Sequence, residues 1–204
     1  MKPKDLLNLY IEKYLVDELQ KLGFRYSKSV PKFTRKIGDF ELTFSFSLSK
    51  WNSEGYCEFW TMWGITSKEY TKWYKKQWGN KPINNGIVGA AEWNIPRWTR
   101  DVTKHFTLTN SKSDEEEFDE LINNIINIAI PYYKKISNWN IAAEYASQET
   151  IILYHKVCDF YLISGQKEKA KKILELGIKE IQQRKHDQLM LLPQIQKRLE
   201  KYFK

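Results

Sequence analysis

The chain has 204 residues, a net charge of +8 and a hydrophobic share of 42%. That share is sufficient for a folded core, which excludes an extended disordered chain. Two cysteines, Cys57 and Cys158, are too few for a disulfide framework, and we expect both to be buried free thiols. Charges interrupt the N-terminal region before any apolar run reaches the length of a signal peptide or membrane span. We therefore expect a soluble, cytoplasmic protein.

The first predicted element is a helix. Apolar residues recur at steps of three and four between positions 6 and 22, which predicts one buried helix face. Gly23 is expected to end this helix in the left-handed conformation. Residues 32–37 then predict a short strand, and Gly38-Asp39 a tight turn.

Two longer strands follow. Apolar and polar residues alternate from position 40 to 49, which predicts a strand with one buried face, formed by Phe40, Leu42, Phe44, Phe46 and Leu48. The next strand, 56–66, is apolar on both faces, with Cys57, Phe59, Trp63 and Ile65 on one and Tyr56, Trp60 and Met62 on the other. Its second face is either covered by another element or left for a partner. The capping-box spacing of Thr66 and Glu69 predicts a helix that could supply the cover.

The segment from position 79 to 94 is rich in Gly, Asn and Pro, which predicts a loop with a short strand at 87–93. Residues 104–109 predict a further strand. A second capping box begins at Ser113 and opens a helix whose acidic run, 114–120, suits the positive end of the helix dipole better than a metal site. Pro131 is expected to kink or end this helix.

From Asn138 onward the pattern is helical, with helices predicted at 151–163, 167–184 and 189–203, the last one bent at Pro193. The predicted fold class is α+β: an antiparallel β-meander sheet packed with helices, followed by a C-terminal α-helical extension. We expect the sheet domain to span residues 1–137 and the extension to span 138–204, docked on the sheet domain because the link is short and lacks Gly and Ser.

Two resemblances accompany this pattern. A helix ending in Leu-Gly-Phe, the strand 33–39, the Phe/Ser-alternating strand ending in Ser-Lys-Trp at 49–51, and a last helix running into Ile-Pro-Tyr-Tyr at 130–133 together resemble the DUF4304 family of bacterial proteins. The resemblance covers about residues 5–136, implies an α+β meander fold, and carries over neither an activity nor any catalytic residue. Residues 161–170 are similar to the turn of a tetratricopeptide-type helical hairpin.

The sequence predicts no catalytic residue, metal or cofactor. The three histidines, His105, His155 and His186, have no metal-ligand spacing with each other or with the cysteines, and no nucleophile-elbow, zinc-protease or phosphate-loop motif occurs. A carboxylate pair assembled in three dimensions from Glu54, Glu58, Glu92 and Asp101 stays open. Whether the chain is an enzyme is thus uncertain, and the balance favours a non-enzyme.

The most suggestive residues are tryptophans interleaved with cations. The candidate partner-binding set is Trp51, Trp60, Trp93, Arg97, Trp98, Arg100 and Lys104. Such rings and cations suit an acidic protein or single-stranded nucleic acid, or they simply close the end of the sheet with arginine stacked on tryptophan. Residues 1–112 carry 19 Lys and Arg against 11 Asp and Glu, so this half is the basic one.

Our hypothesis from sequence is a non-enzymatic interaction protein that binds another protein through this Trp/Arg-rich surface. By analogy with small bacterial α+β proteins, it could neutralise a toxin in an immunity or antitoxin role. The alternative hypothesis is binding of RNA or single-stranded DNA by the basic N-terminal domain. We expect no membrane partner, and the sequence does not predict the oligomeric state.

Overall fold

The computed structural model describes residues 1–181 and 185–204, and the side chains of 1–181 and 190–204. The fold is α+β, as predicted. The chain divides into two compact units, Met1–Lys135 and Ile136–Lys204, two residues from the predicted boundary. Across the described residues, we find no helix with the length and apolar character needed to cross a bilayer.

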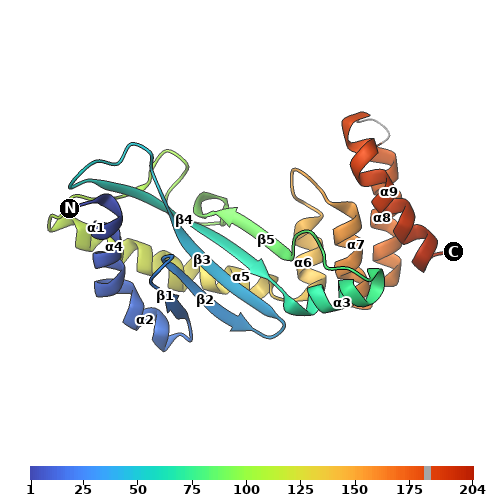
Figure 1. Cartoon of the computed structure of the whole chain (residues 1–204), viewed down its shortest axis with the longest axis horizontal. Helices are drawn as coiled ribbons and strands as arrows, with labels where there is room; N and C mark the ends of the chain where they lie inside the picture. Colours follow the sequence, from blue (N-terminus) through green and yellow to red (C-terminus); the bar gives the residue numbers. More distant parts are fainter. Residues whose placement is uncertain (182–184) are drawn as a thin grey trace. The chain divides into compact units, whose positions relative to one another are not determined.

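The first unit contains the sheet and the helices around it (Figure 1). Its helical segments are α1 (Pro3–Tyr10), η1 (Ile11–Leu15), α2 (Val16–Lys21), α3 (Lys68–Trp78), η2 (Glu92–Asn94), α4 (Ser113–Asn124), η3 (Ile125–Ala129) and α5 (Ile130–Ile136). Its strands are β1 (Arg25–Ser27), β2 (Lys32–Ile37), β3 (Phe40–Leu48), β4 (Cys57–Thr66), β5 (Gly86–Ala91) and β6 (Phe106–Leu108). The predicted end of the first helix is confirmed: Gly23 has φ 82°, and the Phe24 amide donates to the Leu19 carbonyl oxygen at 3.0 Å.

All strand pairs are antiparallel, in the order β1-β2-β3-β4-β5, with β6 paired to β4 beside β5. One edge of β4 is thus shared by two partners. Its first residues, Cys57 to Phe59, pair with β6, whereas Met62 to Thr66 pair with β5. Thr61 lies in the gap between the two, where no strand supplies an acceptor for its amide. The acceptor must therefore come from a side chain.

Helices pack on one face of the sheet. Figure 1 shows the long α4–α5 segment running behind the strands, and ring contacts confirm the packing. Phe59 lies 6.0 Å from Phe118 of α4, and Trp63 stacks on Tyr133 of α5 at 5.5 Å, measured between ring centroids. Both partners are fully buried in this core. Burying a large apolar side chain contributes about 1.5–3 kcal/mol, so the rings buried on this face stabilise the first unit.

The apolar side chains of the alternating strand, β3, are only partly buried in the core. Phe40, Leu42 and Phe44 are buried as predicted, but Phe46 is half-buried and Leu48 is 38% exposed. Burial decreases toward the end of the strand because Leu48 is the last residue of β3, next to the loop that joins β3 to β4. The prediction that all five residues form the core is therefore wrong for Leu48.

Helix α3 leaves the second face of the sheet uncovered. It starts directly after β4 and carries the chain past the end of that strand (Figure 1). Tyr70 of α3 stacks with Trp73 and meets Tyr74 of the same helix edge-on. Met62, on the face in question, remains 38% exposed. The helix begins one residue later than the capping-box prediction, since Ser67 rather than Thr66 is the N-cap and accepts from the Tyr70 amide at 3.2 Å.

The second predicted capping box does not form. Lys112 is the N-cap of α4 and makes no side-chain cap bond, while Asp114 turns back to accept from the amides of Thr109, Asn110 and Ser111. These bonds hold the end of β6 against the helix. Pro131 does not end the helix, because the preceding π-helical segment η3 accommodates a residue that lacks an amide donor.

The second unit is all helical: α6 (Trp139–Ala146), α7 (Tyr154–Ile163), α8 (Lys167–Ile181) and α9 (Lys185–Tyr202), with Pro193 inside α9. The predicted helix at 151–163 starts later, at Tyr154. The predicted end of the next helix, residues 182–184, lies outside the described residues, as does the side chain of His186. Ala170 and Gly177 of α8 are buried, which allows close packing of neighbouring helices.

Charge is buried inside the second unit as a pair. The guanidinium of Arg198 donates to both carboxylate oxygens of Asp159, at 2.7 and 2.6 Å, and both side chains are essentially inaccessible to solvent. Next to Asp159, Cys158 is a buried free thiol whose pKa is raised by burial. Cys57 in the first unit is also free and buried, and burial raises its pKa to about 12. Thiols held neutral in this way are unreactive.

Candidate functional site

The face of the sheet opposite the helices is the candidate functional site, and we call it the open face. Strand register aligns its side chains in cross-strand rows: Arg25, Thr34, Thr43, Gly64 and Gly89 form one row, and Ser27, Lys32, Ser45, Met62 and Ala91 form the next. Among these ten residues only Ala91 is buried. Apart from Arg25, Lys32 and Met62, the residues of these two rows are small: glycine, alanine, serine and threonine.

Three rings gather at one end of the open face, and we call them the ring cluster. Trp60 of β4 lies 4.8 Å from His105 and 6.1 Å from Trp93, and the Trp93 and His105 rings are 5.7 Å apart, measured between centroids. All three are half-buried. The Nδ1 atom of His105 is buried without a hydrogen-bond partner among the described residues. The sequence-predicted residues Trp60 and Trp93 are therefore brought together, and His105 joins them.

Two residues of the predicted set make contacts inside the first unit: Trp98 is buried and Arg100 is half-buried. Trp98 is buried, with its ring 6.3 Å from that of Trp63. Arg100 binds the carboxylates of Glu117 and Glu120, donates to the His105 carbonyl oxygen at 3.0 Å and stacks over the Phe106 ring at 4.0 Å. The side chains of Trp98 and Arg100 are therefore engaged in contacts within the first unit. Sequence alone could not reveal this, because the acids that bind Arg100 follow it by 17 and 20 positions.

The remaining predicted residues are exposed. Arg97 has φ 70°, a left-handed conformation that is uncommon for a residue with a side chain. Lys104 directly precedes His105 of the ring cluster. Trp51 is 77% exposed in the β3–β4 loop, with the ammonium of Lys50 4.9 Å from its ring centroid. In the described part of the chain, no ring contact joins Trp51 to the ring cluster.

A buried carboxylate lies behind the ring cluster. Glu92 follows β5 and fills the gap on the β4 edge, where one of its oxygens accepts from both the amide and the hydroxyl of Thr61 at 2.6 Å. A buried amide without an acceptor would cost about 1–3 kcal/mol, which explains why a carboxylate occupies this position. Burial raises the pKa of Glu92 to about 7, against the opposing effects of the Thr61 hydrogen bonds and the nearby Arg100.

The other acidic candidates are not assembled for acid–base catalysis. Glu54 pairs with the N-terminal ammonium, and Asp101 accepts from Thr103, which lowers the pKa of Asp101. In the part of the chain that the structure describes, no contact joins any two of Glu54, Glu58, Glu92 and Asp101. Nor do three His, Cys, Asp or Glu side chains converge there in a way that could hold a metal ion.

Charge is distributed unequally between the two sides of the first unit. Residues 25–91, which form β1–β5 and α3, carry eleven Lys and Arg against five Asp and Glu. Residues 113–135, which form the α4–α5 layer behind the sheet, carry two against six. The positive potential therefore belongs to the strand side of this unit and favours an acidic partner there.

Comparison of the whole chain with protein-family models, curated protein sequences and solved structures finds no match. The resemblance to the DUF4304 family therefore stays a prediction, and the site is interpreted from its own geometry.

Proposed function

We propose that this chain is a non-enzymatic binding module that takes an acidic protein on its open face, with the ring cluster and Met62 as the main contacts. The observation that carries the proposal is a sheet with helices packed on one face and large apolar side chains on the other. Trp60 and Met62 lie on the second face, where Met62 is 38% exposed. Tryptophan and methionine are enriched at protein interfaces, and buried tryptophans often dominate the binding free energy.

The mixed charge of the open face favours a protein over a nucleic acid. Glu41 lies directly opposite Lys36 across β2 and β3, and Glu58 lies two positions from Trp60 on β4. Fixed carboxylates repel a phosphate backbone, whereas they match the basic residues scattered on a protein surface. The rings of the cluster also face one another instead of forming separate stacking platforms for bases.

The biological setting that we propose for this binding is neutralisation of a toxin, by analogy with other small bacterial interaction proteins. A direct test is co-expression of each captured partner that is toxic to cells with the unmodified chain or with its Trp60→Ala and Met62→Glu variants. Protection that follows binding affinity across the variants is the expected result.

Site-specific photocrosslinking tests the open face. A photoreactive amino acid replaces Met62 on the open face in one protein and the similarly exposed Leu9 of α1 in a matched control. In lysate of the source cells, with and without nuclease, we expect one acidic protein to crosslink at position 62, independently of nuclease, and not at position 9. Nucleic acid as the crosslinked species, or the same proteins at both positions, would refute the proposal.

Affinity measurements then test the contacts. Trp60→Ala is expected to weaken binding of the crosslinked protein by about 2 kcal/mol, the usual loss for a central interface tryptophan. Met62→Glu places a charge at the centre of the face and should abolish binding, whereas Leu9→Glu should leave it unchanged. Near-ultraviolet circular dichroism of each variant checks that the fold is retained.

A further inference from the structure

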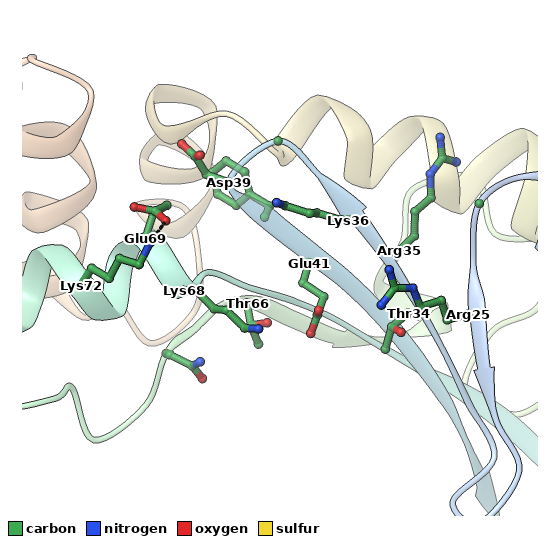
Figure 2. Close-up of a pocket in the computed structure, with 14 residues that line it drawn as sticks. Arg25, Thr34, Arg35, Lys36, Asp39, Glu41, Thr66, Lys68, Glu69 and Lys72 are labelled. Carbon is green, nitrogen blue, oxygen red and sulfur yellow. Dashed lines mark hydrogen bonds and ion pairs between the residues drawn. The ribbon is translucent and has the colours of Figure 1, made fainter.

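A cationic hollow lies at the opposite end of the open face from the ring cluster (Figure 2). Its volume is about 500 Å³, which falls in the range of small-molecule sites. Thr66 of β4 lines it and lies six residues from Trp60, or about 20 Å along an extended strand. The hollow is therefore separate from the ring cluster, and a ligand could bind there whether or not the ring cluster binds a protein.

Cations from three elements converge on this hollow. The charged residues that line it are Arg25, Arg35, Lys36, Lys68 and Lys72 on the basic side and Asp39, Glu41 and Glu69 on the acidic side. Lys72 pairs with Glu69 at 2.7 Å, and Arg35 turns to the other face of β2, where its guanidinium lies 5.8 Å from the Phe24 ring centroid.

The remaining cations of the hollow lack ion-pair partners among the described residues, although Lys36 lies opposite Glu41 across β2 and β3. Arg25, Lys36 and Lys68 form no ion pair with any residue of the described chain. In the view of Figure 2, the Glu41 carboxylate lies between the Arg25 guanidinium and the Lys68 ammonium. Against these three cations stand two carboxylates of the lining that form no ion pair in the described chain either, Asp39 and Glu41, so one positive charge is in excess, which an anionic ligand would neutralise.

A second hollow adjoins the first. It has a volume of about 410 Å³ and shares Lys68, Lys72 and Asn85 with the first hollow. Pro82 and Ile83 form an apolar wall, and Lys81 adds a further cation. Ile83 is fully exposed and so is accessible to a ligand.

We propose that the two hollows together bind an organic phosphate, with the phosphate groups between Arg25, Lys36 and Lys68 and the organic part against Pro82 and Ile83. Arginine binds phosphate through two parallel hydrogen bonds, and lysine binds it as a point charge. Glu41 limits the affinity, because its carboxylate lies among the cations and repels the phosphate.

Isothermal titration of the purified full-length chain with inorganic pyrophosphate and with ADP tests this site. We expect both to bind, and Lys68→Glu or Arg25→Glu to weaken each by about tenfold or more, because each change removes a charge-assisted contact. Lys75→Glu on the same helix as Lys68, outside both hollows, is the matched control and should leave affinity within about twofold. Equal losses in all three variants would show diffuse electrostatic attraction and overturn the proposal, as would the absence of binding.

Two further variants separate the parts of the site. Glu41→Gln removes the repelling charge, so we expect it to tighten binding of both pyrophosphate and ADP; unchanged or weaker binding would place the phosphate elsewhere. Ile83→Ser should weaken ADP and leave pyrophosphate unchanged. If ADP binds no tighter than pyrophosphate in the unmodified protein, the assignment of the second hollow to an organic group is wrong.

Discussion

The two units bury charge in different ways. In the first, the Glu92 carboxylate fills a gap between two strands, and Thr61, a neutral residue, donates two hydrogen bonds to it. In the second, Asp159 is neutralised by a bidentate contact with Arg198. The backbone explains the difference: a split strand edge requires an acceptor, whereas helices satisfy their own amides and leave side chains to pair.

The consequence is a different response to pH. A carboxylate without a cation in contact favours its protonated form when buried, so the pKa of Glu92 is raised to about 7. A carboxylate bound by arginine stays ionised and is costly only when its partner is lost. The stability of the first unit is therefore expected to change with pH near neutrality. The stability of the second unit is expected to fall when Asp159 loses Arg198.

Breaking the buried pair should have the largest effect. Arg198→Leu leaves the Asp159 charge buried without its cation, which typically costs about 3–5 kcal/mol. We expect a loss of this size in the free energy of unfolding, measured by urea denaturation with helical circular dichroism. The double variant Asp159→Leu/Arg198→Leu should recover most of it, because no unpaired charge remains. A single variant as stable as the original would show that the pair is not buried in solution.

The pH response of Glu92 should come next. In the unfolded chain its pKa returns to the ordinary value of 4.5, whereas the folded value is about 7. Between these values the folded state binds more protons at Glu92, so the contribution of Glu92 to stability is greatest below pH 4.5 and is lost as pH rises through 7. The expected change is about 3 kcal/mol. Unfolding monitored by tryptophan fluorescence at about pH 4.5 and about pH 8 measures it.

The control is Glu92→Gln, which keeps an acceptor for Thr61 but does not titrate. The difference between the two proteins isolates Glu92 from opposing groups such as His155, whose pKa burial lowers to about 3 and whose contribution therefore increases as pH rises toward 6.5. Identical pH profiles for the two proteins would contradict the raised pKa.

Close helix packing in the second unit predicts a smaller effect. A β-carbon at Gly177 would lie 2.6 Å from Cγ of Tyr154 and 2.9 Å from Cδ1 of Ile195. Gly177→Ala should therefore cost about 1–3 kcal/mol through overpacking, despite the better helix propensity of alanine. Lys171→Ala, exposed on the same helix, is the control. A stabilising Gly177→Ala would mean that the three helices pack less closely.

The helix caps of the first unit give the smallest predicted effect. Ser67 caps α3 and also donates to the Asp39 carbonyl oxygen at 2.8 Å, so Ser67→Ala should cost about 1 kcal/mol. Lys112 at the start of α4 makes no cap bond, and Lys112→Ala should have no measurable effect. Thermal unfolding of the two variants measures both stability losses. Equal losses for Ser67→Ala and Lys112→Ala would contradict the prediction that only Ser67 stabilises its helix as a cap.

Part of the candidate site was readable from sequence. Alternation along β3 predicted the outward row of Thr43, Ser45 and Ser47, and the doubly apolar β4 predicted Trp60 and Met62 on a second face. The meeting of Trp60, Trp93 and His105 was not predictable, since β5 and β6 share one edge of β4. The cationic hollow was missed for a related reason: its cations are dispersed in sequence and converge only through strand register.

The sequence by itself determined the elements whose signals are local: the helix that ends at Gly23, the alternating strand and the helical tail. The spacing of apolar residues and the positions of glycine determine these elements, and both signals arise from residues that are close in sequence. Tertiary structure alone decided which charges are buried and which rings are exposed. Trp98 and Arg100 resemble surface residues in the sequence, yet one packs on Trp63 and the other binds two glutamates of α4. The environment of a polar or aromatic side chain is set by whatever packs against it, and those partners lie far along the chain.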